Sequence, residues 1–125
     1  MTRANATRPP APESLLPLKP VETLMLTMLA AGERHGYGIR QDVLEHTNGA
    51  IELEAGTLYR HIRHLESDDL IEPSEDRRSG TDDDPRRIYY RLTPFGRRVL
   101  TAELIRLREL VRLAEARRII APVRA

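Results

Sequence analysis

The most informative stretch of the chain is GTLYRHIRHL, residues 56–65. Its apolar residues Leu58, Ile62 and Leu65 fall within a narrow arc at about 100° per residue, which predicts a helix with one buried face. The rest of the helix carries cationic, imidazole and hydroxyl groups, on Thr57, Tyr59, Arg60, Arg63 and His64. Arginine can pair with guanine and hydroxyl groups can bind phosphate, so these residues are a candidate DNA-contact set. An ordinary solvated helix face is the alternative interpretation.

Two further helices are predicted before this stretch. Pro20 suits a first helical turn, and apolar residues recur at helical spacing from there to Leu29, with Gly32 as a stop signal. A shorter helix is predicted from about residue 38 to 46. The HGYG sequence at residues 35–38 does not have the glycine spacing of a phosphate loop, and we expect its glycines to allow the first two helices to approach closely.

Two short strands are predicted after the 56–65 helix. Residues 70–72 read as a strand that ends at Pro73, and residues 87–92 alternate apolar and polar side chains. The segment between them, residues 74–85, is polar and contains glycine and proline, which is typical of a loop. The two strands together predict a hairpin.

A long helix is predicted from Thr93-Pro94 to about Ile120, because threonine is a good N-cap and proline suits the first turn. Apolar residues recur along it at spacings of four and three, at Leu100, Leu104, Leu107, Val111 and Ala114. This pattern is a short heptad seam of about two heptads. One small domain cannot also cover the second apolar flank of such a helix, so we expect a helix from a second subunit to pack there.

The predicted order of three helices, a hairpin and a long helix is that of a winged helix, a variant of the helix-turn-helix. We therefore predict a mainly α fold with a small β-hairpin, in which a winged helix-turn-helix precedes a long C-terminal dimerisation helix. The expected divisions are a disordered proline-rich tail over residues 1–17, a DNA-binding domain over 18–93 and a dimerisation helix over 94–125.

Composition narrows the function classes. The 125 residues suffice for one domain, and the absence of cysteine excludes disulfides, thiolate metal sites and cysteine nucleophiles. The net charge is only +1, but residues 86–125 hold eleven arginines against three glutamates, which favours a polyanionic partner or a solvated helix. The apolar runs are too short to span a bilayer and the N-terminus has no apolar signal region, so we expect a cytoplasmic protein without a membrane partner.

Catalytic and metal chemistry find little support in the sequence. No set of nucleophile, base and orienting acid is evident, so we predict neither an enzyme nor a cofactor. His61 and His64 are three residues apart on one helix and could form a metal-binding pair. No third ligand is evident from the sequence, and we therefore predict no metal site.

Four stretches carry a resemblance to a known family: residues 35–39 (HGYGI), 56–60 (GTLYR), 65–71 (LESDDLI) and 87–96 (RIYYRLTPFG). In order and spacing they resemble the PadR family of bacterial winged-helix transcriptional regulators, of the short type with a single C-terminal helix. The resemblance implies a homodimer, usually a repressor, in which the third helix reads DNA, the hairpin is the wing and the C-terminal helix dimerises with help from the first. It also favours Tyr59 as a phosphate contact.

The wing departs from the expected pattern. Its loop carries the acidic run Asp82-Asp83-Asp84, where a cationic loop would suit phosphate, so direct DNA contact by the wing tip is in doubt. Arg86 and Arg87 on the return strand are expected either to grip the flanking DNA backbone or to pair with these aspartates. Some members of the family that the chain resembles have an aromatic drug-binding pocket at the dimer interface, but this chain has no tryptophan from which to build one.

The leading hypothesis is a sequence-specific dimeric repressor of an inverted-repeat operator, which an effector would release from DNA. Its partners are double-stranded DNA, a second copy of the chain and a small-molecule effector. The alternative is a winged-helix protein-interaction module without DNA affinity, suggested by the acidic wing and by the net charge of −1 across residues 56–70.

Overall fold

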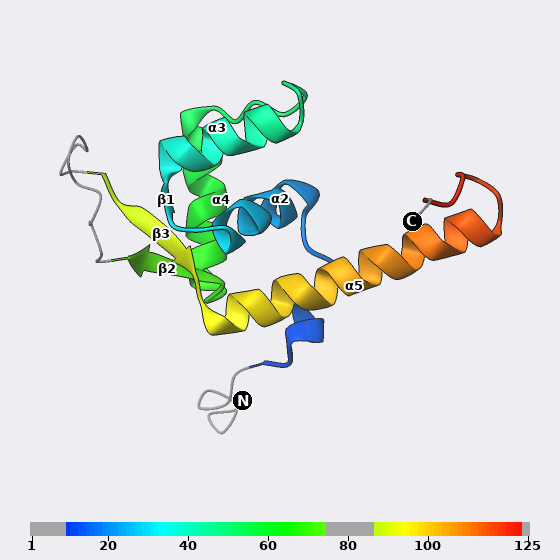
Figure 1. Ribbon diagram of the computed structural model, residues 1–125. Coiled ribbons are helices and arrows are strands. Elements are labelled where there is room, and N and C mark those ends of the chain that lie inside the picture. Colours follow the sequence, from blue (N-terminus) through cyan, green and yellow to red (C-terminus); the bar gives the residue numbers. More distant parts are fainter. Residues whose placement is uncertain (1–9, 75–86, 124–125) are drawn as a thin grey trace.

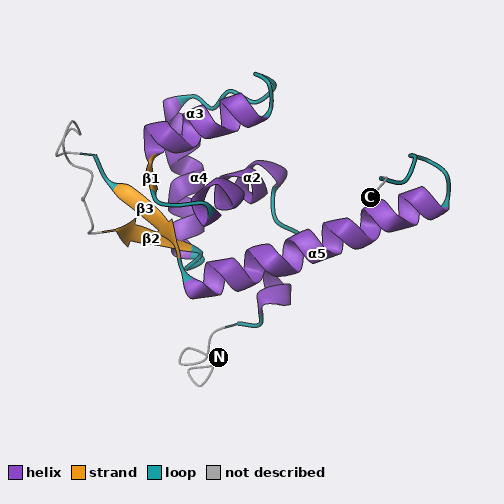
Figure 2. Cartoon of the chain, viewed as in Figure 1, coloured by secondary structure: helices purple, strands orange, loops and turns teal. Residues whose placement is uncertain are grey.

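The computed structural model describes residues 10–74 and 87–123, which form a winged helix with a long C-terminal helix (Figures 1 and 2). In chain order the elements are η1 (Pro12–Leu15), α2 (Pro20–Ala30), β1 (Arg34–His35), α3 (Gly36–His46), α4 (Ala55–Ser67), β2 (Ile71–Ser74), β3 (Tyr89–Leu92) and α5 (Pro94–Ala116). The predicted fold class is confirmed. The expected start of the C-terminal helix is also correct, because the Thr93 hydroxyl caps α5 by accepting the Gly96 N–H at 2.8 Å.

The sheet has one strand more than the predicted hairpin. β3 pairs antiparallel with β2 on one side and with β1 on the other, which gives the order β1-β3-β2. The two residues of β1 are too few to show an alternating pattern, so the sequence does not reveal this strand. α3 begins at Gly36, earlier than expected, because His35 is its N-cap and accepts the Gly38 N–H on Nδ1 at 3.0 Å.

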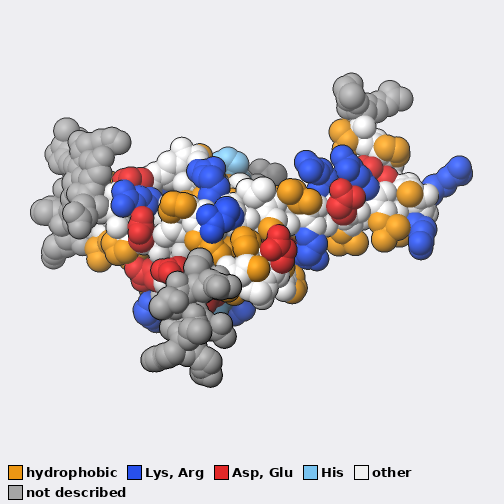
Figure 3. Space-filling model, turned by 90° about the horizontal axis from the view of Figure 1, so that it is seen from below, with side chains coloured by type: hydrophobic (Ala, Val, Ile, Leu, Met, Phe, Trp, Pro, Cys, Tyr) orange, Lys and Arg blue, Asp and Glu red, His pale blue; other side chains and the backbone are white. Residues whose placement is uncertain are grey.

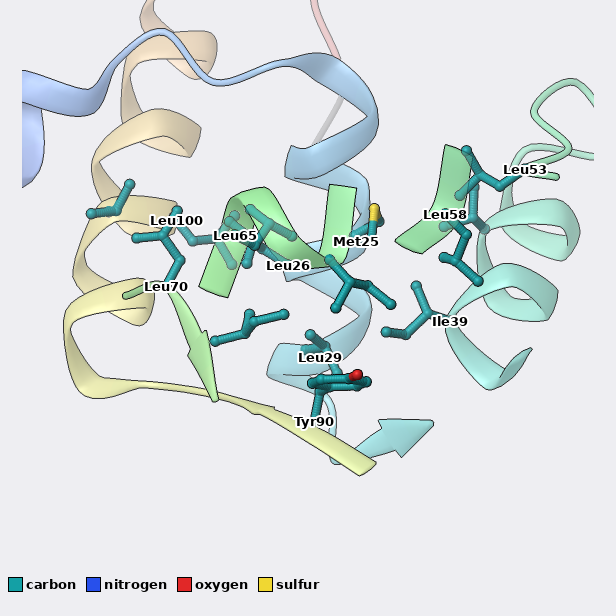
Figure 4. Packing of buried hydrophobic residues seen from close by; sticks show 14 residues of the cluster. Met25, Leu26, Leu29, Ile39, Leu53, Leu58, Leu65, Leu70, Tyr90 and Leu100 are labelled. Atoms are coloured by element: carbon teal, nitrogen blue, oxygen red, sulfur yellow. The ribbon is translucent and has the colours of Figure 1, made fainter. Parts of the chain in front are cut away.

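The core lies between α2, α3, α4, the sheet and the first half of α5 (Figure 4). The predicted apolar stripe of α4 is buried: Leu58, Ile62 and Leu65 are no more than 2% exposed. Leu100, which was predicted in the dimer seam, also belongs to this core and is 5% exposed. It faces its own domain because the first two turns of α5 pack against α2 and β3 rather than projecting from them.

The chain at residues 10–17 is more ordered than the predicted tail. Residues 12–15 form the 3-10 helix η1, which packs on α5, and Leu15 and Leu16 contact the core. The leucines among the prolines explain the difference. Burial of their apolar side chains contributes more favourable free energy than the segment loses in conformational entropy when it becomes ordered. Residues 1–9 of the expected tail lie outside the described residues.

The C-terminal helix ends at Ala116 rather than near Ile120. Arg118 has a positive φ of 61°, and the Ile119 N–H donates to the Ala114 carbonyl. These features form a Schellman turn, which stops the helix although no glycine marks the position.

The buried carboxylate of Glu103 connects α5 to the N-terminal segment. Glu103 is 1% exposed and accepts two hydrogen bonds from the Arg106 guanidinium, at 2.7 and 2.8 Å, and one from the Leu18 N–H at 3.2 Å. The hydrogen bonds from Arg106 hold the pKa of Glu103 below its ordinary value, against the opposing effect of burial.

The lowered pKa of Glu103 predicts a pH-dependent stability. A carboxyl whose pKa is lower in the folded chain stabilises the fold above its unfolded pKa, and this contribution disappears as the pH falls through the folded value. We expect Glu103→Gln to lower the unfolding free energy at pH 7 by about 2 kcal/mol and to have little effect at strongly acidic pH. Urea unfolding followed by circular dichroism at several pH values measures the difference.

Glu109→Gln is the matched control, because Glu109 forms the same type of pair with Arg112 but is 61% exposed. Exposed pairs contribute little, so the control should unfold like the parent chain at every pH. Equal destabilisation by the two substitutions would contradict the role given to Glu103.

Candidate nucleic-acid interface

The outward face of α4 presents two arginines that are free to bind a ligand. Arg60 and Arg63 are exposed, and no acidic group of the described residues pairs with either. The buried stripe on the other side of α4 holds both positions on the surface. Thr57, one turn before Arg60, is half-buried. α4 therefore offers two long cationic side chains from a rigid helix, which suits reading of base edges in the major groove.

His64 occupies a different place from the one that the helical wheel suggested. Its Nδ1 lies 2.9 and 3.0 Å from the two carboxylate oxygens of Glu22 on α2, and its Nε2 lies 3.6 Å from Asp68. The ring thus contacts α2 instead of pointing away from the domain. The sequence could not show this, because Glu22 is 42 residues away in the chain.

A hollow of about 210 Å³ lies beside α4, at the N-terminus of α3. Tyr59 of α4 lies directly over Gly36, and a Cβ atom at this glycine would collide with the phenol ring. The glycine therefore allows α3 and α4 to approach each other closely. The sequence analysis had instead predicted a close approach of the first two helices, α2 and α3. The lining residues are His35, Gly36, Tyr37, Tyr59, Arg87, Ile88 and Tyr90.

The hollow gathers hydrogen-bond donors. His35 Nδ1 accepts the Gly38 N–H, so in the neutral ring the hydrogen is on Nε2. The Arg87 guanidinium lies 3.1 Å from this Nε2 and brings a positive charge to the hollow. Tyr59, which is 41% exposed, adds a hydroxyl group, and the start of α3 adds the positive end of a helix. These groups suit a phosphate of the DNA backbone.

The sequence analysis found part of this hollow. It identified Tyr59 and Arg87 but not His35 or Tyr37, which is 52% exposed. A signal was present, since both belong to the HGYGI stretch that carried the family resemblance, but we interpreted that stretch only as a packing motif. Arg86 and the acidic run 82–84 lie outside the described residues.

The second half of α5 extends beyond the domain (Figure 1) and carries exposed apolar side chains (Figure 3). Leu104, Leu110, Val111 and Leu113 are between 43% and 54% exposed, whereas Leu107 and Ala114 are half-buried. An apolar face of this kind on a projecting helix favours a helical partner.

These features define a winged-helix DNA-binding protein: three core helices, a small sheet, a cationic outer face on α4 and a projecting helix with exposed apolar side chains. More specifically, the chain belongs to the family described as "Transcriptional regulator PadR-like family", whose model matches residues 25–102. The protein is thus a DNA-binding transcriptional regulator, from a family of regulators rather than enzymes. In the described part of the chain, no helix is long and apolar enough to cross a membrane.

Solved structures and a curated protein resemble the chain. A PadR family transcription regulator from Clostridium difficile is 25% identical, with a TM-score of 0.65, and the match covers 77% of this chain and 95% of that chain. A transcriptional regulator from Clostridium thermocellum is 21% identical, with a TM-score of 0.63, and the match covers 93% and 97%. "Uncharacterized protein X" of Lysinibacillus sphaericus is 29% identical over 86 residues, which are 69% of this chain and 75% of that protein.

The donor-rich hollow predicts a specific effect on salt dependence. Each phosphate contact adds about one to the slope of log affinity against log salt concentration, so Arg87→Ala should reduce that slope by about one. Because phosphate contacts carry no sequence information, the substitution should weaken binding to all duplexes about equally. Fluorescence anisotropy with generic duplex DNA at several salt concentrations measures the slope.

Arg91→Ala is the control, because Arg91 lies on β3, just after Arg87, and already pairs with Glu72 at 2.8 Å. We expect this variant to keep the slope of the parent chain. If the salt dependence of binding in Arg87→Ala had the same slope as in the parent chain, the hollow would not hold a phosphate.

Proposed function

We propose that the protein is a homodimeric repressor that binds an inverted-repeat operator with one α4 helix in each half-site. The observation that carries the proposal is the pair of unpartnered arginines on α4, held outward by a fully buried apolar stripe. Arg60 and Arg63 would contact base edges, while Thr57, Tyr59 and Arg87 would contact phosphate. We leave His64 out of this set because its ring is engaged by Glu22.

The proposed dimer forms through the second half of α5. Leu104, Leu107, Val111 and Ala114 make up the seam, and Leu110 and Leu113 extend it. A two-fold axis through this seam would place the two α4 helices about 34 Å apart, on half-sites one turn of DNA apart. An effector that changes the position of one α5 relative to the other would change this separation and release the operator.

Selection of bound duplexes from random DNA tests the proposed function as a whole. We expect the purified chain to enrich an inverted repeat. Enrichment of a single half-site or a direct repeat would contradict the two-fold arrangement. No enrichment, together with binding that does not depend on salt, would favour the protein-interaction module instead.

Arg60→Ala is expected to weaken binding to the selected operator by about 1–3 kcal/mol and to relax specificity at one base pair of each half-site. An arginine that pairs with a base edge accounts for both effects. Anisotropy titrations with the operator and with single-base variants measure them. The control Arg108→Ala removes an exposed arginine of α5 and should preserve specificity. Unchanged specificity in Arg60→Ala would remove this residue from the base-reading set.

Val111→Glu is expected to convert the dimer into a monomer. The substitution would bury an unpaired carboxylate in the seam, which costs about 3 kcal/mol or more. Sedimentation equilibrium should report the 14.3 kDa mass of one chain for the variant and twice that mass for the parent. Circular dichroism checks that α5 remains helical, and Arg108→Ala again serves as control. A parent chain that sediments as a monomer would disprove the seam.

A further inference from the structure

A second hollow lies between α3 and the start of α4, and we call it the α3–α4 hollow. Its volume is about 480 Å³, which is within the usual range of sites for small organic ligands. Its walls combine two phenol rings, two aliphatic side chains, one guanidinium and one carboxylate. The lining residues are Tyr37, Arg40, Glu54, Ala55, Leu58 and Tyr59.

The carboxylate of the α3–α4 hollow has no compensating charge. Glu54 is exposed and is the N-cap residue of α4, but its side chain makes no capping hydrogen bond. Among the described residues, no cationic group forms an ion pair with it. The guanidinium, in contrast, is engaged, because Arg40 Nε donates to the Leu53 carbonyl at 2.6 Å and Nη2 donates to Glu52 at 3.1 Å. The hollow therefore presents one uncompensated negative charge to a ligand.

Two aromatic rings line the same space. Tyr37 is 52% exposed and Tyr59 is 41% exposed, so both rings are accessible to a ligand. The face of an aromatic ring attracts a cation, and quaternary ammonium ligands are typically bound in this way. Ala55 and Leu58 add aliphatic surface, which suits apolar groups around the charge of such a ligand.

We propose that the α3–α4 hollow binds an organic cation, which is a molecule with one positive charge and an apolar body. The Glu54 carboxylate would compensate the charge, while the phenol rings and the aliphatic side chains would cover the body. A metal ion is not favoured, because the described walls contain one carboxylate and no imidazole. An anion is not favoured either, because the Arg40 guanidinium already pairs with Glu52.

The position of the α3–α4 hollow connects it with the proposed function. Tyr37 and Tyr59 line both this hollow and the donor-rich hollow, and Tyr59 is a proposed phosphate contact. A cation packed against these rings would compete with DNA for Tyr59 and so weaken DNA binding. This consequence rests on the proposed repressor function, whereas binding of the cation does not and is measured without DNA.

The experiment titrates the full-length protein with tetraphenylphosphonium by calorimetry, in sodium buffer without DNA. Tetraphenylborate is the control ligand, since it has nearly the same size and shape but the opposite charge. We expect saturable binding of one tetraphenylphosphonium ion per chain, and binding of tetraphenylborate that is weaker by about 10-fold or more. Equal or tighter binding of tetraphenylborate would overturn the proposal, and so would the absence of saturable binding of the cation.

Substitutions locate the bound cation. Glu54→Gln removes the charge and keeps the length of the side chain, so it should lower the affinity for tetraphenylphosphonium by about 5-fold. Tyr37→Leu removes one ring and should lower it by about 2- to 5-fold. Glu45→Gln is the control, because Glu45 is an exposed carboxylate of α3 that does not line the hollow. Unchanged affinity in folded Glu54→Gln, or an equal loss in Glu45→Gln, would overturn the assignment of the site.

The effect on DNA is measured separately, by fluorescence anisotropy with generic duplex DNA. Saturating tetraphenylphosphonium should weaken DNA binding by the parent chain several-fold, and Glu54→Gln should need about 5-fold more of the cation for the same effect. If the cation binds in calorimetry but DNA affinity stays the same, the link through Tyr59 is wrong. If the parent chain binds the cation but no DNA, the proposed repressor function fails while the cation site stands.

Discussion

The arrangement of the whole domain depends on the burial of one side of α4. Leu58, Ile62 and Leu65 fill the space between α2, α3 and the sheet, so the helix cannot rotate about its axis without exposing them. Truncation of one such side chain to alanine typically costs 2–5 kcal/mol. The same constraint holds the two arginines of α4 on the surface, because their positions on the helix are set by the residues that are buried. Packing in the core thus fixes the geometry of recognition.

Most of the fold could be predicted from local sequence. Proline in the first turn and threonine as N-cap mark the starts of α2 and α5 correctly, because capping is satisfied within a few residues. The features that were missed depend on contacts between residues far apart in the chain, or on a backbone conformation that the residue type does not indicate. β1 exists only because β3 lies beside it, and α5 ends where an arginine adopts a conformation that usually requires glycine.

In the candidate site, too, features set by local sequence could be predicted, whereas features set by contacts between distant residues could not. The exposure of Arg60 and Arg63 could be predicted from the helical wheel, because no described residue forms an ion pair with either of them. His64 lies on the same helix, yet Glu22 engages it, and no local pattern links residues 42 positions apart. The hollow beside Tyr59 was only partly found for a similar reason. It brings together the start of α3, Tyr59 of α4 and residues at and just before the start of β3, which only the tertiary structure places side by side.

The connection between β3 and α5 determines how a movement of α5 at the proposed dimer seam would be transmitted to α4, the helix proposed to contact DNA. Thr93 both caps α5 and donates its hydroxyl hydrogen to the Asp69 carbonyl, and Gly96 packs so tightly on Leu70 that a Cβ atom would not fit. α5 is therefore fixed to the turn that follows α4. Its apolar side runs without interruption from Leu100 in the core to Val111 beyond the domain. A rotation of α5 against a partner helix would consequently carry α4 with it, so in the proposed dimer the distance between the two α4 helices would depend on how the two α5 helices pack.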